Sequence, residues 1–278
     1  MPGVTAIERP CFADLGDITL FYTDHGEGGT PLLLVHGWGA DSQEWVWHLP
    51  ALSADRRVIA VDLRGHGYST APESGNNPRR MAGDLVRLCA LLDIPRVVAV
   101  GHSMGAVIVS LLAAEHPELV EAVVTVEPGY GYTGFVAENM PGMIQALRKG
   151  DTGAIAVQID EWSYGAASPD WLRLWHARRL RATPPHVLIE AFEALFGGDE
   201  PIGLRPHSDE LLRRRACPVL TFWFDPAQAD WERSLFKHPQ SRAVVWEGSG
   251  HRLHEERPAE FVSVVTRWLK TLGRAPRS

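Results

Sequence analysis

The sequence has 278 residues, 45% hydrophobic and 22% charged, as in a soluble globular protein that is long enough to bury a sizeable core. The net charge of −7 argues against nucleic acid or an anionic membrane surface as a partner. Cys11, Cys89 and Cys217 lie too far apart to indicate a disulfide framework or a zinc site. No apolar run has the length of a signal peptide or a membrane span, so we expect a cytoplasmic protein.

Apolar runs bounded by turns predict the strands of a buried sheet. An early alternating stretch at 18–23 is typical of an antiparallel strand, whereas later continuous runs are typical of strands buried on both faces. Apolar residues at helical spacing predict a helix over 79–92. Strands that alternate with helices favour a mostly parallel sheet. The later strands are expected at 31–35, 57–61, 97–100, 121–126, 218–223 and 241–246.

This alternation stops after the strand at 121–126, and only helical stretches follow up to about residue 206. Glycines and prolines separate these stretches, which is typical of a helical insertion rather than an independent domain. We therefore expect a core made of residues 1–132 and 207–278, with a helical cap at 133–206. The helices of the insertion are expected at 140–148, 152–163, 169–181 and 185–196.

The sequence Gly-His-Ser-Met-Gly at 101–105 joins an apolar strand to an apolar helix. In that context the pattern predicts a sharp turn that presents Ser103 at the top of a sheet, as a nucleophile. The two glycines lack a Cβ, so strand and helix can approach each other closely on either side of the serine. A helix N-terminus at this point also favours negative charge.

Four short motifs follow successive strands: His-Gly-Trp-Gly at 36–39, Asp-Leu-Arg-Gly-His-Gly-Tyr-Ser at 62–69, the serine motif at 101–105, and Gly-His-Arg-Leu-His-Glu-Glu-Arg-Pro at 250–258. With them the chain resembles the α/β-hydrolase superfamily over nearly its whole length. The resemblance implies an α/β fold with a mostly parallel eight-stranded sheet and helices on both faces. It also implies a helical cap between strands six and seven, and chemistry at the carboxyl edge of the sheet.

A serine nucleophile needs a base and an acid. His251 is the best base, because it follows the last strand and the order in this fold is serine, acid, histidine. The acid usually follows strand seven in a Gly-x-x-Asp turn, but here the glycine is missing and neither Asp225 nor Asp230 is in register. Some haloalkane dehalogenases and the zearalenone lactonases place it at the end of strand six, where this chain has Glu127. We favour Glu127, then Asp225, then Asp230.

An oxyanion hole needs two backbone N–H groups that face the developing charge. One is expected from Met104, which follows the nucleophile, and the family pattern implies that Trp38 supplies the other. Three further histidines are not expected to react. His102 is expected to pack or hydrogen-bond beneath the turn, His36 to brace the oxyanion loop, and His254 to lie on the surface or behind the site.

Aromatic residues predict the wall of the substrate pocket, and they favour an apolar or aromatic ester or lactone over a charged or sugar substrate. No His-Glu-x-x-His motif and no clustered Cys/His spacing suggests a metal, so neither a metal nor another cofactor is expected. The pocket residues predicted from the sequence are Trp38, Tyr130, Trp162, Trp171 and Trp175.

These observations predict a cofactor-independent serine hydrolase, a monomer or homodimer, that cleaves a small-molecule carboxylic ester or lactone. A carbon–carbon bond hydrolase of the meta-cleavage type has the same triad and stays open as an alternative. A ligand receptor that keeps the hydrolase fold is a second alternative. Haloalkane dehalogenases and epoxide hydrolases of this fold carry an aspartate at the nucleophile position, so Ser103 argues against both.

Overall fold

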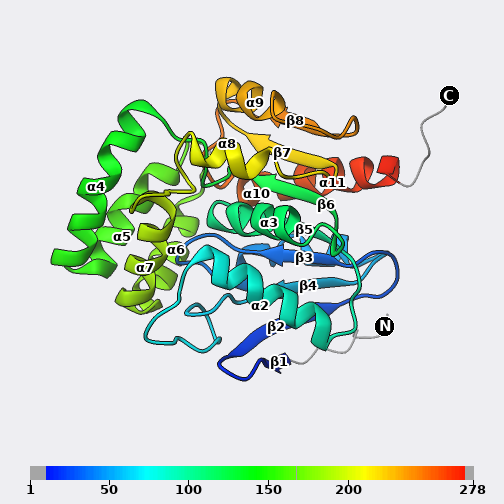
Figure 1. Ribbon diagram of the computed structural model, residues 1–278, viewed down its shortest axis with the longest axis horizontal. Helices are drawn as coiled ribbons and strands as arrows, with labels where there is room; N and C mark the ends of the chain where they lie inside the picture. The colour runs from blue at the N-terminus through cyan, green and yellow to red at the C-terminus, as the bar shows by residue number, and fades with distance from the viewer. Residues whose placement is uncertain (1–10, 167, 273–278) are drawn as a thin grey trace.

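A computed structural model describes residues 11–166 and 168–272, and a single eight-stranded sheet runs through it (Figure 1). The strands are β1 (Cys11–Asp14), β2 (Thr19–His25), β3 (Leu32–Val35), β4 (Val58–Val61), β5 (Val97–His102), β6 (Val120–Val126), β7 (Val219–Trp223) and β8 (Arg242–Val245). Their order is β1-β2-β4-β3-β5-β6-β7-β8. The pairs β1–β2 and β2–β4 are antiparallel and the other neighbours are parallel, which confirms the predicted fold.

Helices cover both faces of the sheet. In Figure 1, α2 and α3 lie in front of the strands and α11 lies behind them. The helices of the core are η1 (Ser42–Trp45), α1 (Leu49–Leu52), α2 (Pro78–Leu91), α3 (Met104–Glu115), α8 (His207–Leu212), α9 (Pro226–Arg233), α10 (Leu253–Glu256) and α11 (Pro258–Leu272). Four longer helices and a short one occupy the predicted insertion: α4 (Gly134–Lys149), α5 (Thr152–Asp160), η2 (Glu161–Ser163), α6 (Asp170–Ala182) and α7 (Pro185–Phe196).

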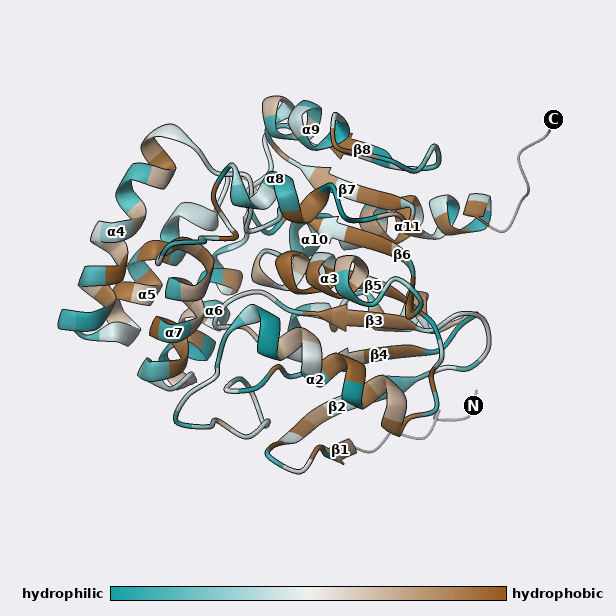
Figure 2. Ribbon diagram, viewed as in Figure 1, coloured by the Kyte–Doolittle hydropathy of each residue, from teal (hydrophilic) through white to brown (hydrophobic). Residues whose placement is uncertain are grey.

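The central strands carry the apolar core, as the brown ribbons of Figure 2 show. Successive residues of a strand face opposite sides of the sheet, so Leu33 and Ala99 pack in one core cluster and Leu34 and Val100 in the other. Helix α3 is buried from Met104 to Ala113, which explains its uniformly apolar sequence. Burial on both faces therefore holds β5 and α3, which flank Ser103, in a fixed place.

Three short elements were not predicted from the sequence: β1, α8 and α10. Each has four to six residues, too few for a hydrophobic period to be recognised. β1 pairs with β2 from Cys11 opposite Tyr22 to Asp14 opposite Thr19, so it extends the antiparallel edge of the sheet. In the strand order, β2, β4 and β3 separate β1 from β5, which leads to Ser103.

The helices α4 to α7 gather beyond the carboxyl ends of the parallel strands, at the left of Figure 1. In the sequence these helices lie between β6 and β7, where the insertion was predicted. Ligands of open parallel sheets bind beyond the carboxyl ends of the strands. The four helices therefore lie where they can enclose a site at the strand ends.

Gly101 and Gly105 flank the turn at Ser103 and lie against backbone atoms. A Cβ on Gly101 would lie 2.3 Å from the carbonyl oxygen of Gly105, and one on Gly105 would lie 2.3 Å from that of Val35. Both distances are far shorter than real Cβ contacts. Glycine at these positions therefore allows α3 to start directly against the end of β3.

We expect Gly105→Ala to lower the free energy of unfolding by about 1–3 kcal/mol, because the new methyl group displaces the end of β3. Gly83→Ala is the matched control: Gly83 lies in α2, and nothing is within 4 Å of the position of its Cβ. This change should raise the free energy of unfolding by about 0.5–1 kcal/mol. Urea unfolding measures both, and equal effects of the two substitutions would contradict the steric argument.

Candidate active site

Ser103 forms the turn between β5 and α3 with φ 51° and ψ −116°. Its N–H donates to the carbonyl of Val126, and its own carbonyl accepts from the N–H of Gly129. These two bonds tie the serine to the end of β6. A non-glycine residue with positive φ is strained, and such strain persists where the surrounding structure enforces it, commonly at functional sites.

Glu127 lies at the end of β6 and contacts the imidazole of His251. Its Oε2 is 3.4 Å from Nδ1 of His251, and its Oε1 accepts a 2.6 Å hydrogen bond from the N–H of Phe224. Glu127 also has a positive φ of 38°, so two of the three non-glycine residues with positive φ in the described chain lie at this site. The arrangement brings Ser103, Glu127 and His251 to one edge of the sheet.

The two aspartates that the sequence left as alternatives have other partners. Asp225 precedes α9, and its side chain accepts a hydrogen bond from the N–H of Ala227, as an N-cap residue does. Asp230 is exposed and forms an ion pair with Arg233 one turn along the same helix. Asp225 reaches the wall of the cavity described below, but its carboxylate is engaged in starting a helix.

Burial changes the acidity of both members of the contact. It raises the pKa of Glu127 well above the usual range, although the N–H of Phe224 opposes the change. It lowers the pKa of His251 well below the usual range, and the charges of His102 and Arg252 lower it further. An imidazole with a lowered pKa is neutral at pH 7, which is the form that can accept a proton from a hydroxyl.

The loop after β3 lies opposite the serine turn. His36 braces it: the N–H of Leu63 donates to Nε2 of His36, and Nδ1 lies 2.7 Å from the carbonyl of Gly37. The indole N–H of Trp38 donates to the carbonyl of Leu188 in α7, which fixes the side chain against the helical insertion. Across the cleft, Met104 begins α3, and the first N–H groups of a helix have no partner within the helix.

A cavity of about 320 Å³ opens beside Ser103 and His251. Residues of the strand ends form its floor, and residues of α4, α5, η2 and α7 form the opposite wall. The apolar side chains of the wall are Trp38, Tyr132, Val136, Met140, Met143, Ile159, Trp162, Phe192, Leu195, Phe196, Trp223 and Phe224.

Of the five predicted pocket residues, Trp38 and Trp162 line this cavity and the other three lie elsewhere. Tyr130 is wholly buried behind the site, where its hydroxyl donates to Glu232. Trp171 packs against Trp175 on the outer part of α6, with a ring separation of 5.9 Å. Helical spacing identifies aromatic residues but does not tell which face of a helix turns towards the cavity.

Two charged residues of the wall, Asp160 and Arg252, were not predicted from the sequence. Arg252 follows His251, and its Nη2 donates to Oδ1 of Asp160 at 2.6 Å. Both side chains are more than nine-tenths buried, so the ion pair joins α5 to the histidine loop inside the protein. The position of Arg252 next to His251 was the one feature of the sequence that could have placed it near the site. Nothing in the sequence around Arg252 identifies Asp160 as its partner.

A sequence model of the α/β-hydrolase fold family matches residues 30–153. An (E)-2-((N-methylformamido)methylene)succinate hydrolase of Acinetobacter baylyi is 30% identical over 262 residues, covering 91% of this chain and 95% of that protein. The chain belongs to the α/β-hydrolase fold family. A dihydrolipoyllysine-residue acetyltransferase component of an acetoin cleaving system from Pseudomonas putida is 42% identical over 223 residues, 80% of this chain and 52% of that protein.

The chain spans about half or less of the length of the first three curated relatives it matches. Among solved structures, a thermophilic esterase from Thermogutta terrifontis superposes with a TM-score of 0.80, at 24% identity over 96% of this chain and 100% of the esterase. The fold of this chain therefore agrees with that of the esterase over nearly its whole length. In the described part of the chain, every helix is too short or too polar to span a membrane.

Glu127→Gln should lower kcat by about 10³–10⁴-fold, because the amide cannot stabilise an imidazolium at His251 as a carboxylate does. Asp225→Asn is the matched control: it replaces the other candidate carboxylate, which caps α9 and does not contact His251, and it should retain turnover. Hydrolysis of p-nitrophenyl butyrate measures both variants. The reverse result would assign the acid to Asp225.

Proposed function

We propose that the chain is a cofactor-independent serine hydrolase that cleaves a carboxylic ester or lactone of an apolar or aromatic small molecule. One observation carries the proposal: a strained Ser103 and a His251–Glu127 contact lie at one cavity whose wall is mainly apolar. Ser103 is the nucleophile, His251 the general base and Glu127 the acid of the triad. The segment 133–206 acts as the cap that supplies the roof of the pocket.

The reaction proceeds through an acyl-enzyme. Ser103 Oγ attacks the carbonyl carbon while Nε2 of His251 takes the hydroxyl proton, since Nδ1 faces Glu127. The N–H groups of Met104 and Trp38 stabilise the oxyanion of the tetrahedral intermediate. His251 then gives the proton to the leaving oxygen, and later activates the water that releases the acid and restores Ser103.

The cavity supports an uncharged substrate of modest size. Its volume of about 320 Å³ lies at the lower end of the range for small-molecule sites, and aromatic and aliphatic side chains from α4 and α7 face Ser103. Arg252 reaches the wall, but Asp160 neutralises its charge. The relative from Acinetobacter baylyi is named for a succinate derivative, and the apolar wall of this chain favours a different substrate.

A carbon–carbon bond hydrolase uses the same nucleophile, base and acid, so it is the nearest alternative. A ligand receptor with a hydrolase fold is the other, and it needs no reactive serine. The strained backbone at Ser103 favours an enzyme over a receptor, because a receptor gains nothing from that strain.

A fluorophosphonate probe should label the wild-type chain covalently, and Ser103→Ala should lose the label. Ser110→Ala is the matched control: Ser110 lies further along α3, buried against Arg215 and away from the cavity, so this variant should keep the label. An unlabelled wild type would favour the receptor.

A panel of p-nitrophenyl esters, lactones and vinylogous diketones then separates the two enzyme classes. We expect turnover of medium-sized apolar or aromatic esters or lactones, with kcat in Ser103→Ala lower by about 10⁶-fold. Turnover of the diketones alone would favour a carbon–carbon bond hydrolase over an ester hydrolase.

A further inference from the structure

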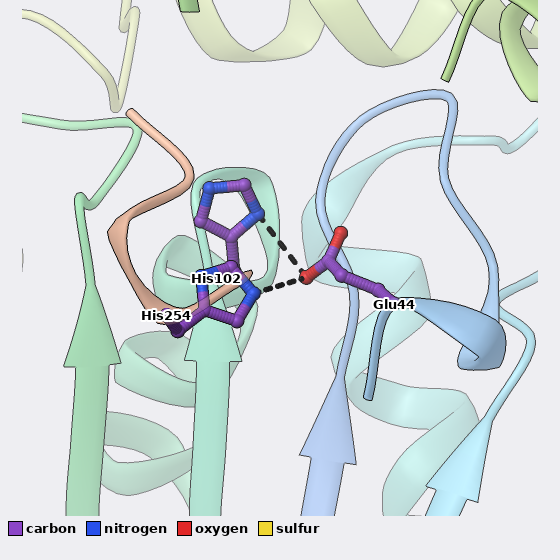
Figure 3. Close-up of side chains that lie close together, drawn as sticks. All are labelled: Glu44, His102 and His254. Carbon is purple, nitrogen blue, oxygen red and sulfur yellow. Dashed lines mark ion pairs between the residues drawn. The ribbon is translucent and has the colours of Figure 1, made fainter. Parts of the chain in front are cut away.

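Glu44 lies beneath the active site and contacts three of its loops. It belongs to η1, and its side chain has no exposed surface. One carboxylate oxygen, Oε1, is 3.1 Å from Nδ1 of His102 and 3.5 Å from Nε2 of His254. Dashed lines mark these two contacts in Figure 3. The other, Oε2, accepts a 3.2 Å hydrogen bond from the N–H of Gly37. Glu44 thus connects the oxyanion loop, the serine turn and the histidine loop.

His102 extends this connection to the catalytic base. Its Nε2 lies 3.0 Å from the carbonyl oxygen of His251, and its ring is 4.9 Å from the ring of His251. A carbonyl oxygen and a carboxylate oxygen are both acceptors, so each ring nitrogen of His102 faces an acceptor. Nδ1 and Oε1 lie at ion-pair distance without hydrogen-bond geometry. An imidazolium suits both neighbours, because Nε2 then donates to the carbonyl and the positive charge faces the carboxylate.

The neighbouring groups agree with this assignment of charge. Burial alone raises the pKa of Glu44, but the charges and hydrogen bonds of His102 and His254 together hold the pKa well below the usual range. Burial lowers the pKa of His254 to about 4, so His254 is neutral near pH 7. Two groups can supply positive charge beside the carboxylate of Glu44: His102, 3.1 Å from Oε1, and Arg252, whose Nη1 lies 3.9 Å from Oε2.

We propose that Glu44 and His102 form a buried ion pair that positions the active-site loops for catalysis. In this pair His102 is an imidazolium that donates to the carbonyl of His251, and Glu44 accepts from the N–H of Gly37 beside the oxyanion donor Trp38. Both are positioning residues, because they act through His251 and Trp38 rather than on the substrate. The proposal rests on the proposed function of Ser103 and His251.

A small displacement of the Glu44–His102 pair is expected to lower the rate of the reaction at Ser103. His102 adjoins Ser103 in the chain, so one side chain sets the distance between the serine turn and the loop of the base. Misplacing a catalytic group by about 1 Å can cost about a hundredfold in rate. Breaking the pair also leaves an uncompensated buried charge on the remaining partner.

A comparable pair joins α6 to Glu255, which follows His254 in the histidine loop. His176 in α6 contacts Glu255 at 3.0 Å, and both side chains are as deeply buried as those of His102 and Glu44. His176 neither contacts His251 nor lines the cavity. A loss of rate that follows from disrupting any buried histidine–glutamate pair would thus appear in His176→Gln as well.

The first experiment measures the charge of His102 without using activity. In wild-type protein with ¹⁵N-labelled histidine, the ring nitrogens of His102 are assigned at pH 7 by comparison with the spectrum of His102→Gln. We expect both nitrogens to be protonated. A neutral His102 would overturn the proposal. So would one equivalent of tightly bound divalent metal that Glu44→Gln loses, because a metal would then join these side chains in place of a proton.

The second experiment measures the rate of Ser103 labelling by a fluorophosphonate. His102→Gln and Glu44→Gln should each lower the second-order rate constant about a hundredfold. The double variant should lose less than the product of the two single losses, because residues in one pair act together. His176→Gln should label at the wild-type rate. Equal losses in all three single variants would reduce the pair to a structural role and overturn the proposal.

The pH dependence of labelling distinguishes a charged His102 from a purely structural role of its side chain. The cation at His102 lowers the pKa of His251, so its removal should move the acid limb of the profile to higher pH. His176→Gln should leave the acid limb in place, and an unmoved limb in His102→Gln would contradict a charged His102. The charged and titratable groups that face His251 are Glu127, His102, Arg252, Asp160 and Glu44.

The two proposals fail in different ways. An unlabelled wild-type chain would end the proposed function, whatever the charge of His102. A labelled wild type whose His102→Gln and Glu44→Gln variants react at the wild-type rate would end the positioning role alone.

Discussion

The contact between α3 and the end of β3 fixes the geometry of the carboxyl edge of the sheet. Gly105 lies so close to the carbonyl of Val35 that no side chain fits between them. Helix α3 therefore starts immediately after Ser103, and the serine takes a backbone conformation that other turns avoid. The N–H groups of Ala106 and Val107 in its first turn donate to the carbonyl of Ser103. Packing between two buried elements thus fixes the place of Ser103 at the strand ends.

Beyond the strand ends, charged and titratable side chains join the apolar core, and several of them are buried in pairs. Glu44 faces His102, and Arg252 faces Asp160. Taking such groups out of water is costly, and the attraction within each pair offsets the cost only while both partners remain in place. The loops of the site are consequently interdependent, because each pair joins residues of two different loops or helices. These pairs therefore add to the hydrophobic packing that holds β5 and α3 in place.

The sequence predicts the parts of the site that local chemistry determines. Apolar runs reveal the strands, two glycines reveal the turn at Ser103, and a strand end places Glu127 within reach of the histidine loop. It does not predict contacts that depend on the orientation of whole helices. Trp171 is an aromatic residue of the helical insertion, which is why the sequence predicts it in the pocket. In the structure it packs on the outer part of α6 against Trp175. Likewise Asp160 and Arg252 are far apart in sequence, so their pairing arises only from the folded arrangement.

The same folded arrangement joins the pocket wall to the catalytic base. The N–H of His251 donates to the carbonyl of Ser163 in η2 at 2.8 Å, and Gly250 lies against Gly165 with no room for a side chain. Trp162, at the mouth of the cavity, immediately precedes Ser163. In the proposed hydrolase, pressure from a bulky substrate on this wall should reach the backbone that holds His251. Because rate depends steeply on the position of a catalytic base, we expect the wall to influence turnover as well as binding. The backbone hydrogen bond from His251 to Ser163 is the contact through which the two would be coupled.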